Sequence, residues 1–139
     1  MASFILGFLG GFIAWLATGL LAQPLSRFFA LRTAAAEALT RYEDRFNSSR
    51  DMSLATPDWM TERRLAYEDC GADLAAFTVS NAWVARLLGQ FPLKRFRYYA
   101  RFAGSNLQSL AQTDPGTETS EYFRVRVVAA LRLASWRKN

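Results

Sequence analysis

The feature that most limits how this chain can fold is an uncharged segment near its N-terminus, Ser3 to Ala22. It contains fourteen apolar residues, four glycines, one serine and one threonine. At about 1.5 Å of rise per residue, twenty helical residues reach about 30 Å, which is the thickness of the hydrocarbon core of a bilayer. The segment therefore predicts one transmembrane helix.

Two other structures have segments of similar composition. A cleaved signal peptide usually begins with basic residues, but Met1-Ala2-Ser3 has none, and the uncharged run continues to Ser26, which is long for a removable segment. A buried helix of a soluble domain is usually shorter than this run. We therefore favour a membrane anchor. Because the first charges, Arg27 and Arg32, follow the span, we expect the N-terminus outside and the C-terminal body in the cytoplasm.

The rest of the chain has the size and composition of one small domain. All 17 basic and all 12 acidic residues follow Ser26. About 115 residues can form one domain with a modest core, but not two domains. We therefore divide the chain into a transmembrane anchor over 1–26 and a cytosolic helical domain over 27–139.

Apolar residues recur every three or four positions in three long segments of this domain, which is typical of amphipathic helices. The rows are Phe28, Ala35, Leu39, Tyr42 and Phe46 in a helix over about 25–46; Met60, Tyr67, Cys70, Leu74 and Phe77 in a helix that ends near 79; and Leu93, Phe96, Ala100, Ala103, Leu107 and Leu110 in a helix that ends near 112. The first two rows can face each other in an antiparallel pair joined by a short loop. At Pro24, either a new helix begins or one long helix kinks.

Capping and turn residues predict where these helices begin and end. Thr56 is the expected N-cap of the second helix, with Pro57 in its first turn. The other predicted features are a loop over 47–51, a short helix over 82–88 that ends at 89–92, and a turn over 114–116.

The last segment, about 120–136, has mixed signals. Phe123 to Val127 alternates like a strand, but residues 129–134 favour a helix and no partner strand is predicted elsewhere. We therefore expect a helix capped by Thr117 or Thr119. The predicted fold class is all-α, with one N-terminal transmembrane helix followed by a cytosolic bundle of three to five helices.

Basic residues gather in two segments of the domain. Residues 86–101 and residues 124–139 each carry a net charge of +5, so the remainder of the chain carries −5. On the third helix, the basic residues share a face with a tyrosine, away from the apolar row. The residues of this predicted basic face are Lys94, Arg97, Tyr98 and Arg101.

Four interpretations of the basic face are open: a solvated surface, contact with anionic lipid headgroups, an acidic protein partner, or nucleic acid. A membrane anchor would hold the domain beside an anionic leaflet, which favours headgroups or an acidic partner close to them. A mixed arginine and tyrosine face lacks the motifs that read bases, so a nucleic-acid partner is disfavoured.

Small residues form a stripe along the predicted transmembrane helix. Gly7 and Gly11 form a G-x-x-x-G motif, and Ala14 and Thr18 continue the same face. Such a stripe allows close approach of another helix, so we expect a helix–helix contact in the membrane, either with a protein partner or in a homo-oligomer. Trp15 lies deep in the span, outside the usual interfacial position, which favours a protein neighbour.

The residue types argue against an enzyme. The chain has no histidine, so a Ser-His-Asp or Cys-His device is impossible, although Ser-Lys or paired-carboxylate chemistry is compatible with the composition. We expect the acidic group of Glu68, Asp69 and Asp73 to be a solvated surface. No phosphate-binding glycine loop is present. With a single cysteine, expected to be a buried thiol, a zinc site or an intramolecular disulfide is not predicted. We expect no catalytic residues, no metal and no cofactor.

The chain resembles, in general form, the small single-span inner-membrane proteins of unassigned function found in bacteria. The likeness rests on a short N-terminal tail, one span, the junction Pro24-Leu25-Ser26-Arg27-Phe28-Phe29 and an amphipathic helical body. It implies a bacterial inner membrane and a helical cytosolic domain. It implies no activity and no functional residues.

Two classes of function fit these features. The first is a non-catalytic, membrane-anchored interaction, accessory or regulatory protein that presents a helical bundle at the cytoplasmic face. The alternative is a membrane-active protein that perturbs or remodels the inner leaflet through basic amphipathic helices. Long apolar rows suited to packing in a core favour the first class.

Overall fold

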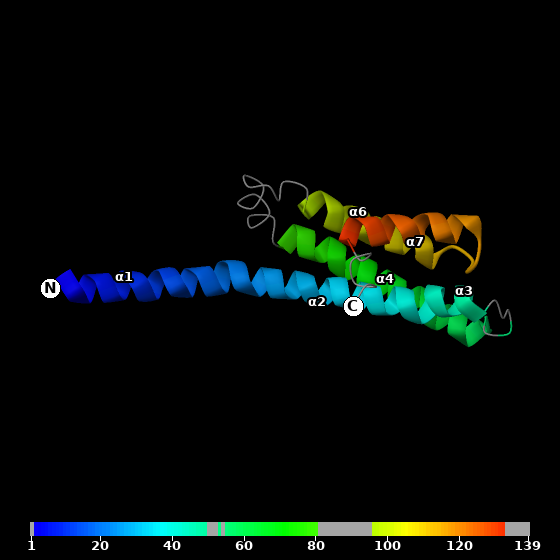
Figure 1. Cartoon of the computed structure of the whole chain (residues 1–139), viewed down its shortest axis with the longest axis horizontal. Helices are drawn as coiled ribbons and strands as arrows, with labels where there is room; N and C mark the ends of the chain where they lie inside the picture. Colours follow the sequence, from blue (N-terminus) through cyan, green and yellow to red (C-terminus); the bar gives the residue numbers. More distant parts are fainter. Residues whose placement is uncertain (1, 50–52, 54, 81–95, 133–139) are drawn as a thin grey trace.

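A computed structural model of the chain describes residues 2–49, 53, 55–80 and 96–132 (Figure 1). All regular structure in these ranges is helical, which confirms the prediction of an all-α chain for this part. The elements are, in chain order, α1 (Ala2–Ala17), the π-helical turn η1 (Thr18–Ala22), α2 (Gln23–Leu39), the π-helical turn η2 (Thr40–Asp44), α3 (Arg45–Ser49), α4 (Pro57–Ser80), α6 (Phe96–Ala111) and α7 (Glu118–Leu131).

The first five elements form one uninterrupted helical rod, so of the two alternatives at Pro24 the structure has the single long helix. A proline inside a helix lacks a backbone N–H and its ring clashes with the carbonyl four residues earlier. The backbone widens into η1 immediately before Pro24, and the N–H of Gln23 donates to the carbonyl of Thr18, five positions back. This wider turn lets the helix pass the proline without ending.

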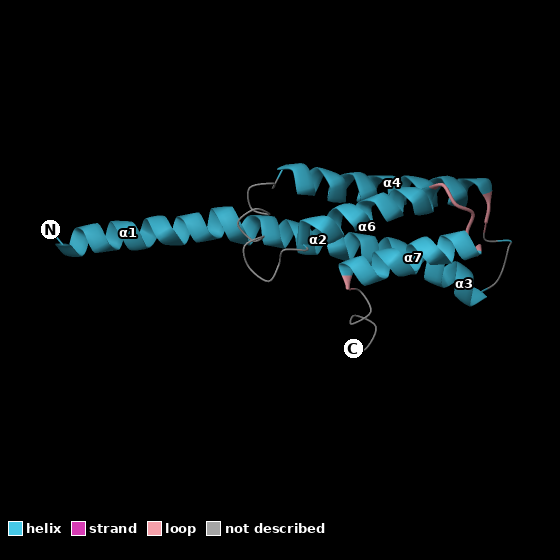
Figure 2. Cartoon of the chain, turned by 90° about the horizontal axis from the view of Figure 1, so that it is seen from above, coloured by secondary structure: helices cyan, strands magenta, loops and turns pink. Residues whose placement is uncertain are grey.

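The two halves of the rod have different surroundings (Figures 1 and 2). α1 projects beyond the rest of the molecule, and its large apolar side chains are exposed, with Phe8 at 71% and Trp15 at 69%. From α2 onward, one face of the rod is covered by the other helices. The predicted apolar row is confirmed there: Ala35, Leu39, Tyr42 and Phe46 are buried and Phe28 is partly buried.

The other helices pack along this covered half of the rod. α2 packs against α4, as Figure 1 shows, and α4 packs against α6 and α6 against α7, as Figure 2 shows from above. The predicted antiparallel pairing of the first two amphipathic helices is visible in two ring contacts. The centroids of Phe28 and Phe77 lie 5.8 Å apart, and those of Tyr42 and Tyr67 lie 5.9 Å apart. Leu74 and Phe77 on α4, and Ala100, Ala103, Leu107 and Leu110 on α6, are buried as predicted.

α4 and α6 meet backbone to backbone at two glycines. A Cβ added to Gly71 would lie 2.9 Å from the carbonyl oxygen of Gly104, and a Cβ added to Gly104 would lie 2.9 Å from the carbonyl oxygen of Gly71. Real Cβ atoms do not approach backbone oxygens this closely, so both positions need glycine. Gly104 therefore allows the backbones of α4 and α6 to approach closely, although in the sequence it only weakens the helix propensity of its segment.

Side-chain caps define the ends of the helices as expected. Thr56 Oγ1 accepts a hydrogen bond from the N–H of Trp59 at the start of α4, at 3.3 Å. Of the two candidate caps for α7, the structure uses Thr117, whose Oγ1 accepts from the N–H of Ser120 at 3.1 Å. Gly116, in the predicted turn, has a φ of +75°, which favours glycine.

α7 ends at the left-handed residue Arg132, earlier than predicted, and residues 133–139 lie outside the described part. The carbonyl groups at the end of α7 accept hydrogen bonds from a side chain on another helix. Arg32 on α2 donates from Nε to the carbonyl of Leu131 and from Nη2 to that of Arg132, each at 2.8 Å. A guanidinium at a helix C-terminus satisfies carbonyls that have no intrahelical partner and complements the negative end of the helix dipole.

Two sequence predictions are wrong in detail. Asn47 to Ser49 are helical, because Phe46 is buried against Trp59, with ring centroids 5.7 Å apart, and this contact extends the helix into α3. Cys70 is only half-buried, because its side of α4 faces an open groove. The predicted short helix over 82–88 and Leu93, the first residue of the third apolar row, lie outside the described residues.

A buried ion pair lies within this apolar packing. Glu43 on η2 and Arg63 on α4 are 0% and 1% exposed, and Arg63 Nε donates to Glu43 Oε1 at 2.7 Å. Arg63 Nη1 also donates to the carbonyl of Thr113, at 2.8 Å. Within the described part, Glu43 Oε2 has no hydrogen-bond partner. Burial, followed by the charge of Glu43, raises the pKa of the adjacent Tyr67, which keeps its hydroxyl protonated.

We predict that removing either member of this pair strongly destabilises the domain. Arg63→Met leaves the Glu43 carboxylate buried without its partner, which typically costs about 3–5 kcal/mol. The double variant Arg63→Met/Glu43→Leu should recover much of this loss, because neither charge is then buried. Thermal unfolding of the full-length chain in detergent, followed by circular dichroism, measures the effect.

The matched control is Arg64→Met, one residue away on the exposed side of α4, where Arg64 pairs with Glu68 at 2.7 Å. This pair is solvated, so its loss should leave the melting temperature nearly unchanged. Equal melting temperatures for the Arg63 and Arg64 variants would contradict the prediction.

Candidate functional site

The exposed N-terminal half of the rod is the first candidate surface. The helix that begins with α1 is long and apolar enough to cross a membrane, and none of its most apolar window is buried. The one threonine of the uncharged segment Ser3 to Ala22 is satisfied within the helix, because Thr18 Oγ1 donates to the carbonyl of Ala14 at 2.8 Å. An uncharged helix with internally bonded polar groups is what a bilayer core accommodates.

The structure leaves the predicted small-residue stripe uncovered. A Cβ at Gly7 or Gly11 would meet nothing within 4 Å, and Ala14 and Thr18 are exposed. No described residue of the same chain packs on this stripe. A helix–helix contact through Gly7, Gly11, Ala14 and Thr18 therefore stays a prediction that concerns another molecule.

The predicted basic face lies at the start of α6. Tyr98 is 63% exposed and Arg101 is exposed, so both are available to a partner. The backbone of Arg97 belongs to the same helix, and Lys94 lies outside the described residues. The ring of Tyr98 stacks on that of Phe102, with centroids 5.8 Å apart and an interplanar angle of 19°.

A series of contacts places this face at the end of the domain next to α1. Gly104 on α6 meets Leu74 on α4, where an added Cβ would lie 3.4 Å from the Cβ of Leu74. The two helices are antiparallel, so one turn further along, Arg101 lies level with Phe77. Phe77 contacts Phe28 on α2. The first turns of α6 are therefore level with the residues that directly follow the apolar segment (Figure 1).

An arginine and two aromatic rings join α6 to α7 on the outer surface, and the sequence analysis did not identify them. The guanidinium of Arg126 lies 4.6 Å from the ring centroid of Phe102 and 4.9 Å from that of Tyr122. Arg126 Nη1 also donates to the Tyr122 hydroxyl. The spacing of four between Tyr122 and Arg126 indicates a shared helical face, but the contact with Phe102 depends on packing between helices.

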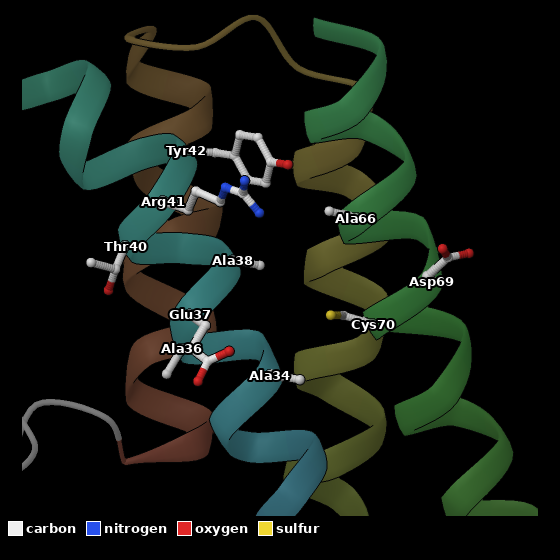
Figure 3. A pocket seen from close by; sticks show the side chains of 10 residues that line it. All are labelled: Ala34, Ala36, Glu37, Ala38, Thr40, Arg41, Tyr42, Ala66, Asp69 and Cys70. Atoms are coloured by element: carbon white, nitrogen blue, oxygen red, sulfur yellow. The ribbon is translucent and has the colours of Figure 1, made fainter. Parts of the chain in front are cut away.

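A shallow groove runs between α2 and α4 (Figure 3). Its volume is about 630 Å³, and it is mostly apolar. Small side chains form its floor, among them Ala34 and Ala38 from α2 and Ala66 from α4, and the Cys70 sulfur points towards α2. In this view α6 and α7 lie behind the groove, so its open side faces solvent.

The groove keeps its thiol protonated. Burial, followed by the negative charges of Asp73 and Asp69, raises the pKa of Cys70. Because the thiolate is the nucleophile, a raised pKa lowers the reactivity of Cys70 at neutral pH. Asp69 and Asp73 are exposed, as expected for a solvated acidic surface, and Glu68 pairs with Arg64.

A second open pocket, of about 740 Å³, lies at the other end of the domain, between α3 and the start of α7. Its one basic side chain, Arg124, donates to Glu121 at 2.8 Å and to Asp44 at 2.9 Å. These bonds tie α7 to η2 and neutralise the arginine locally. Among the described residues, no group of histidine, cysteine and acidic side chains is arranged to hold a metal ion.

Comparison of the chain with known protein families, with characterised proteins and with solved structures finds no significant match.

We predict that Cys70 reacts slowly with alkylating agents. In the folded full-length chain, the rate of reaction with iodoacetamide should rise with pH to a midpoint above that of a free cysteine, because its pKa is raised. Asp69→Asn/Asp73→Asn should lower this midpoint, because it removes two negative charges beside the sulfur. The same chain unfolded in denaturant is the control, and an identical midpoint in the folded and unfolded states would contradict the prediction.

Proposed function

We propose that this protein is a non-catalytic, single-pass protein of a bacterial inner membrane, which presents its helical bundle at the cytoplasmic face as an interaction, accessory or regulatory module. The observation that carries this proposal is the continuous rod. Its N-terminal half is bare, uncharged and long enough to cross a bilayer, and its C-terminal half forms part of the core of the folded domain.

The rod gives the domain a defined position relative to the bilayer. No loop or glycine-rich linker separates the span from the domain, because the helix is continuous through Pro24. An anchor that only retained a protein at the membrane would work equally well with a flexible linker. A rigid connection is useful where a partner must meet the domain at a set height and orientation, as in an accessory subunit of a membrane complex.

The surfaces available to a partner are the bare stripe on α1 and the exposed faces of the bundle. A protein partner with its own span would meet Gly7 and Gly11 in the membrane, where small residues allow close helix packing. A second copy of this chain can use the same stripe, which would give a homo-oligomer. Lipid is the other partner that this topology implies.

The packing of the domain disfavours the alternative of a membrane-active protein. Amphipathic helices that perturb a leaflet insert their apolar face into it. In α6, this face is already used, since Ala100, Ala103 and Leu107 are fully buried in the core. Exposing it to lipid would require the domain to unfold.

The topology gives the main test. The full-length chain should remain in the membrane pellet after carbonate extraction. A reporter fused after Asn139 should be active in the cytoplasm, because Arg27 and Arg32 follow the span and the preceding tail has no charged side chain. Extraction by carbonate, or activity of the reporter only in the periplasm, would show that the proposal is wrong.

Liposome leakage separates the two classes of function. We expect the reconstituted full-length protein to retain an encapsulated dye, because its apolar faces are packed in the bundle. A known pore-forming peptide at the same protein-to-lipid ratio is the positive control. Dye release at a low ratio would support the membrane-active class instead.

A further inference from the structure

The charges of the domain are separated along its axis. All the described aspartate and glutamate residues lie in two ranges, 37–73 and 114–121. The segments at the end of the domain next to α1 contain none. These acid-free segments are 23–36 on the rod, 74–80 at the end of α4, and the first turns of α6 from residue 96; the acid-free stretch then continues along the whole of α6, to residue 113.

The exposed side chains at this end are of the kinds that occur at a membrane interface. Arg27 on α2 and Arg101 on α6 are exposed. Phe29 is 55% exposed and Tyr98 is 63% exposed. Basic and aromatic side chains are enriched where a protein meets lipid headgroups, because the aromatic rings sit at headgroup level and the cations pair with anionic groups.

The level of Tyr98 above the apolar segment falls within the thickness of a headgroup layer, and the level of Arg101 lies just beyond it. Arg101 is level with Phe77, and Phe77 contacts Phe28, so Arg101 is also level with Phe28. Tyr98 lies one helical turn before Arg101 and is level with Leu25, one turn before Phe28. Counted from Ala22 at about 1.5 Å per residue, these levels are about 5 to 9 Å beyond the end of the apolar segment. The headgroup region on each side of the hydrocarbon core is about 5 to 7 Å thick.

We propose that this membrane-proximal end, made of Arg27, Phe29, Tyr98 and Arg101, docks on anionic phospholipid headgroups of the leaflet next to the domain. The inference rests on the proposed anchoring and specifies what the anchored domain contacts. The acid-free end is attracted to the anionic leaflet, and the acidic end is repelled by it, so both ends of the domain favour the same upright orientation.

The attraction of two arginines to an anionic surface is strong enough to orient the domain, but not to hold it at the membrane alone. A basic residue near an anionic surface is worth about 1 kcal/mol before salt screening. Arg27 and Arg101 together should therefore shift the balance between docked and undocked orientations about tenfold or more. The span holds the domain at the membrane in either orientation.

The test measures the solvent access of two labelled positions on α4 in the full-length chain. In a Cys70→Ala background, Val79→Cys places a fluorescent bimane label near the membrane-proximal end, where Val79 is 74% exposed. Leu65→Cys, at a residue 53% exposed, places the control label about 21 Å further along the same helix. Each protein is reconstituted in nanodiscs of phosphatidylcholine alone, or with about a third phosphatidylglycerol, and quenched with neutral acrylamide.

We expect the label at position 79 to be quenched markedly less in the anionic nanodiscs than in the neutral ones, and high salt should remove the difference. Arg27→Gln/Arg101→Gln should also remove it. Arg41→Gln/Arg64→Gln, which removes two exposed arginines from the other end, should leave it intact. The label at position 65 should be quenched equally in both lipids.

Equal quenching at position 79 in the two lipids overturns the docking proposal, as does a difference that survives Arg27→Gln/Arg101→Gln or that is equally large at position 65. Carbonate extraction of host membranes that contain the same full-length variants separates this failure from that of the proposed function. A chain that resists extraction but shows no lipid-dependent quenching is anchored without docking. A chain that is extracted overturns both proposals.

Discussion

The structure depends on the hydrogen bond from the Gln23 N–H to the Thr18 carbonyl, five positions back. It closes the wide turn that lets the helix pass Pro24. Without that turn, the clash of the proline ring with the preceding carbonyl would kink or end the helix at the point where the apolar segment ends. The position of the packed domain relative to α1 follows from this continuous connection.

Packing contacts then fix how the other helices are aligned along the rod. The Glu43–Arg63 pair holds η2 against α4, the facing glycines hold α4 against α6, and Arg32 holds the end of α7. The buried pair is costly to break, but it is weak evidence for overall stability, because a well-packed apolar pair is often equally stable. A role in fixing the register between η2 and α4 agrees better with its place between two apolar surfaces.

Local patterns in the sequence predict much of this fold. The apolar rows on α2, α4 and α6 are readable because burial on one face of a helix imposes a period near 3.6. The caps at Thr56 and Thr117 are equally local. Contacts between different helices cannot be predicted from local patterns. No pattern pairs Glu43 with Arg63, Arg126 with Phe102, or Gly71 with Gly104. The predictions for the half-buried Cys70 and the helical Asn47 are wrong for the same reason, because a groove and a ring contact between helices decide their environments. The basic face stays a prediction from the sequence, whereas the level of Tyr98 and Arg101 relative to the apolar segment depends on contacts through Leu74 and Phe77, which no local pattern predicts.

The bundle lies to one side of the rod, not around it, and this asymmetry has a mechanical consequence. When a helix carries a bundle on one side, rotation of the helix about its own axis moves the bundle sideways. If a neighbouring helix in the bilayer turned α1 by one residue, about 100°, the bundle would sweep through the same angle around that axis. A change confined to the lipid phase would then move a whole surface outside it, because no loop separates α1 from α2.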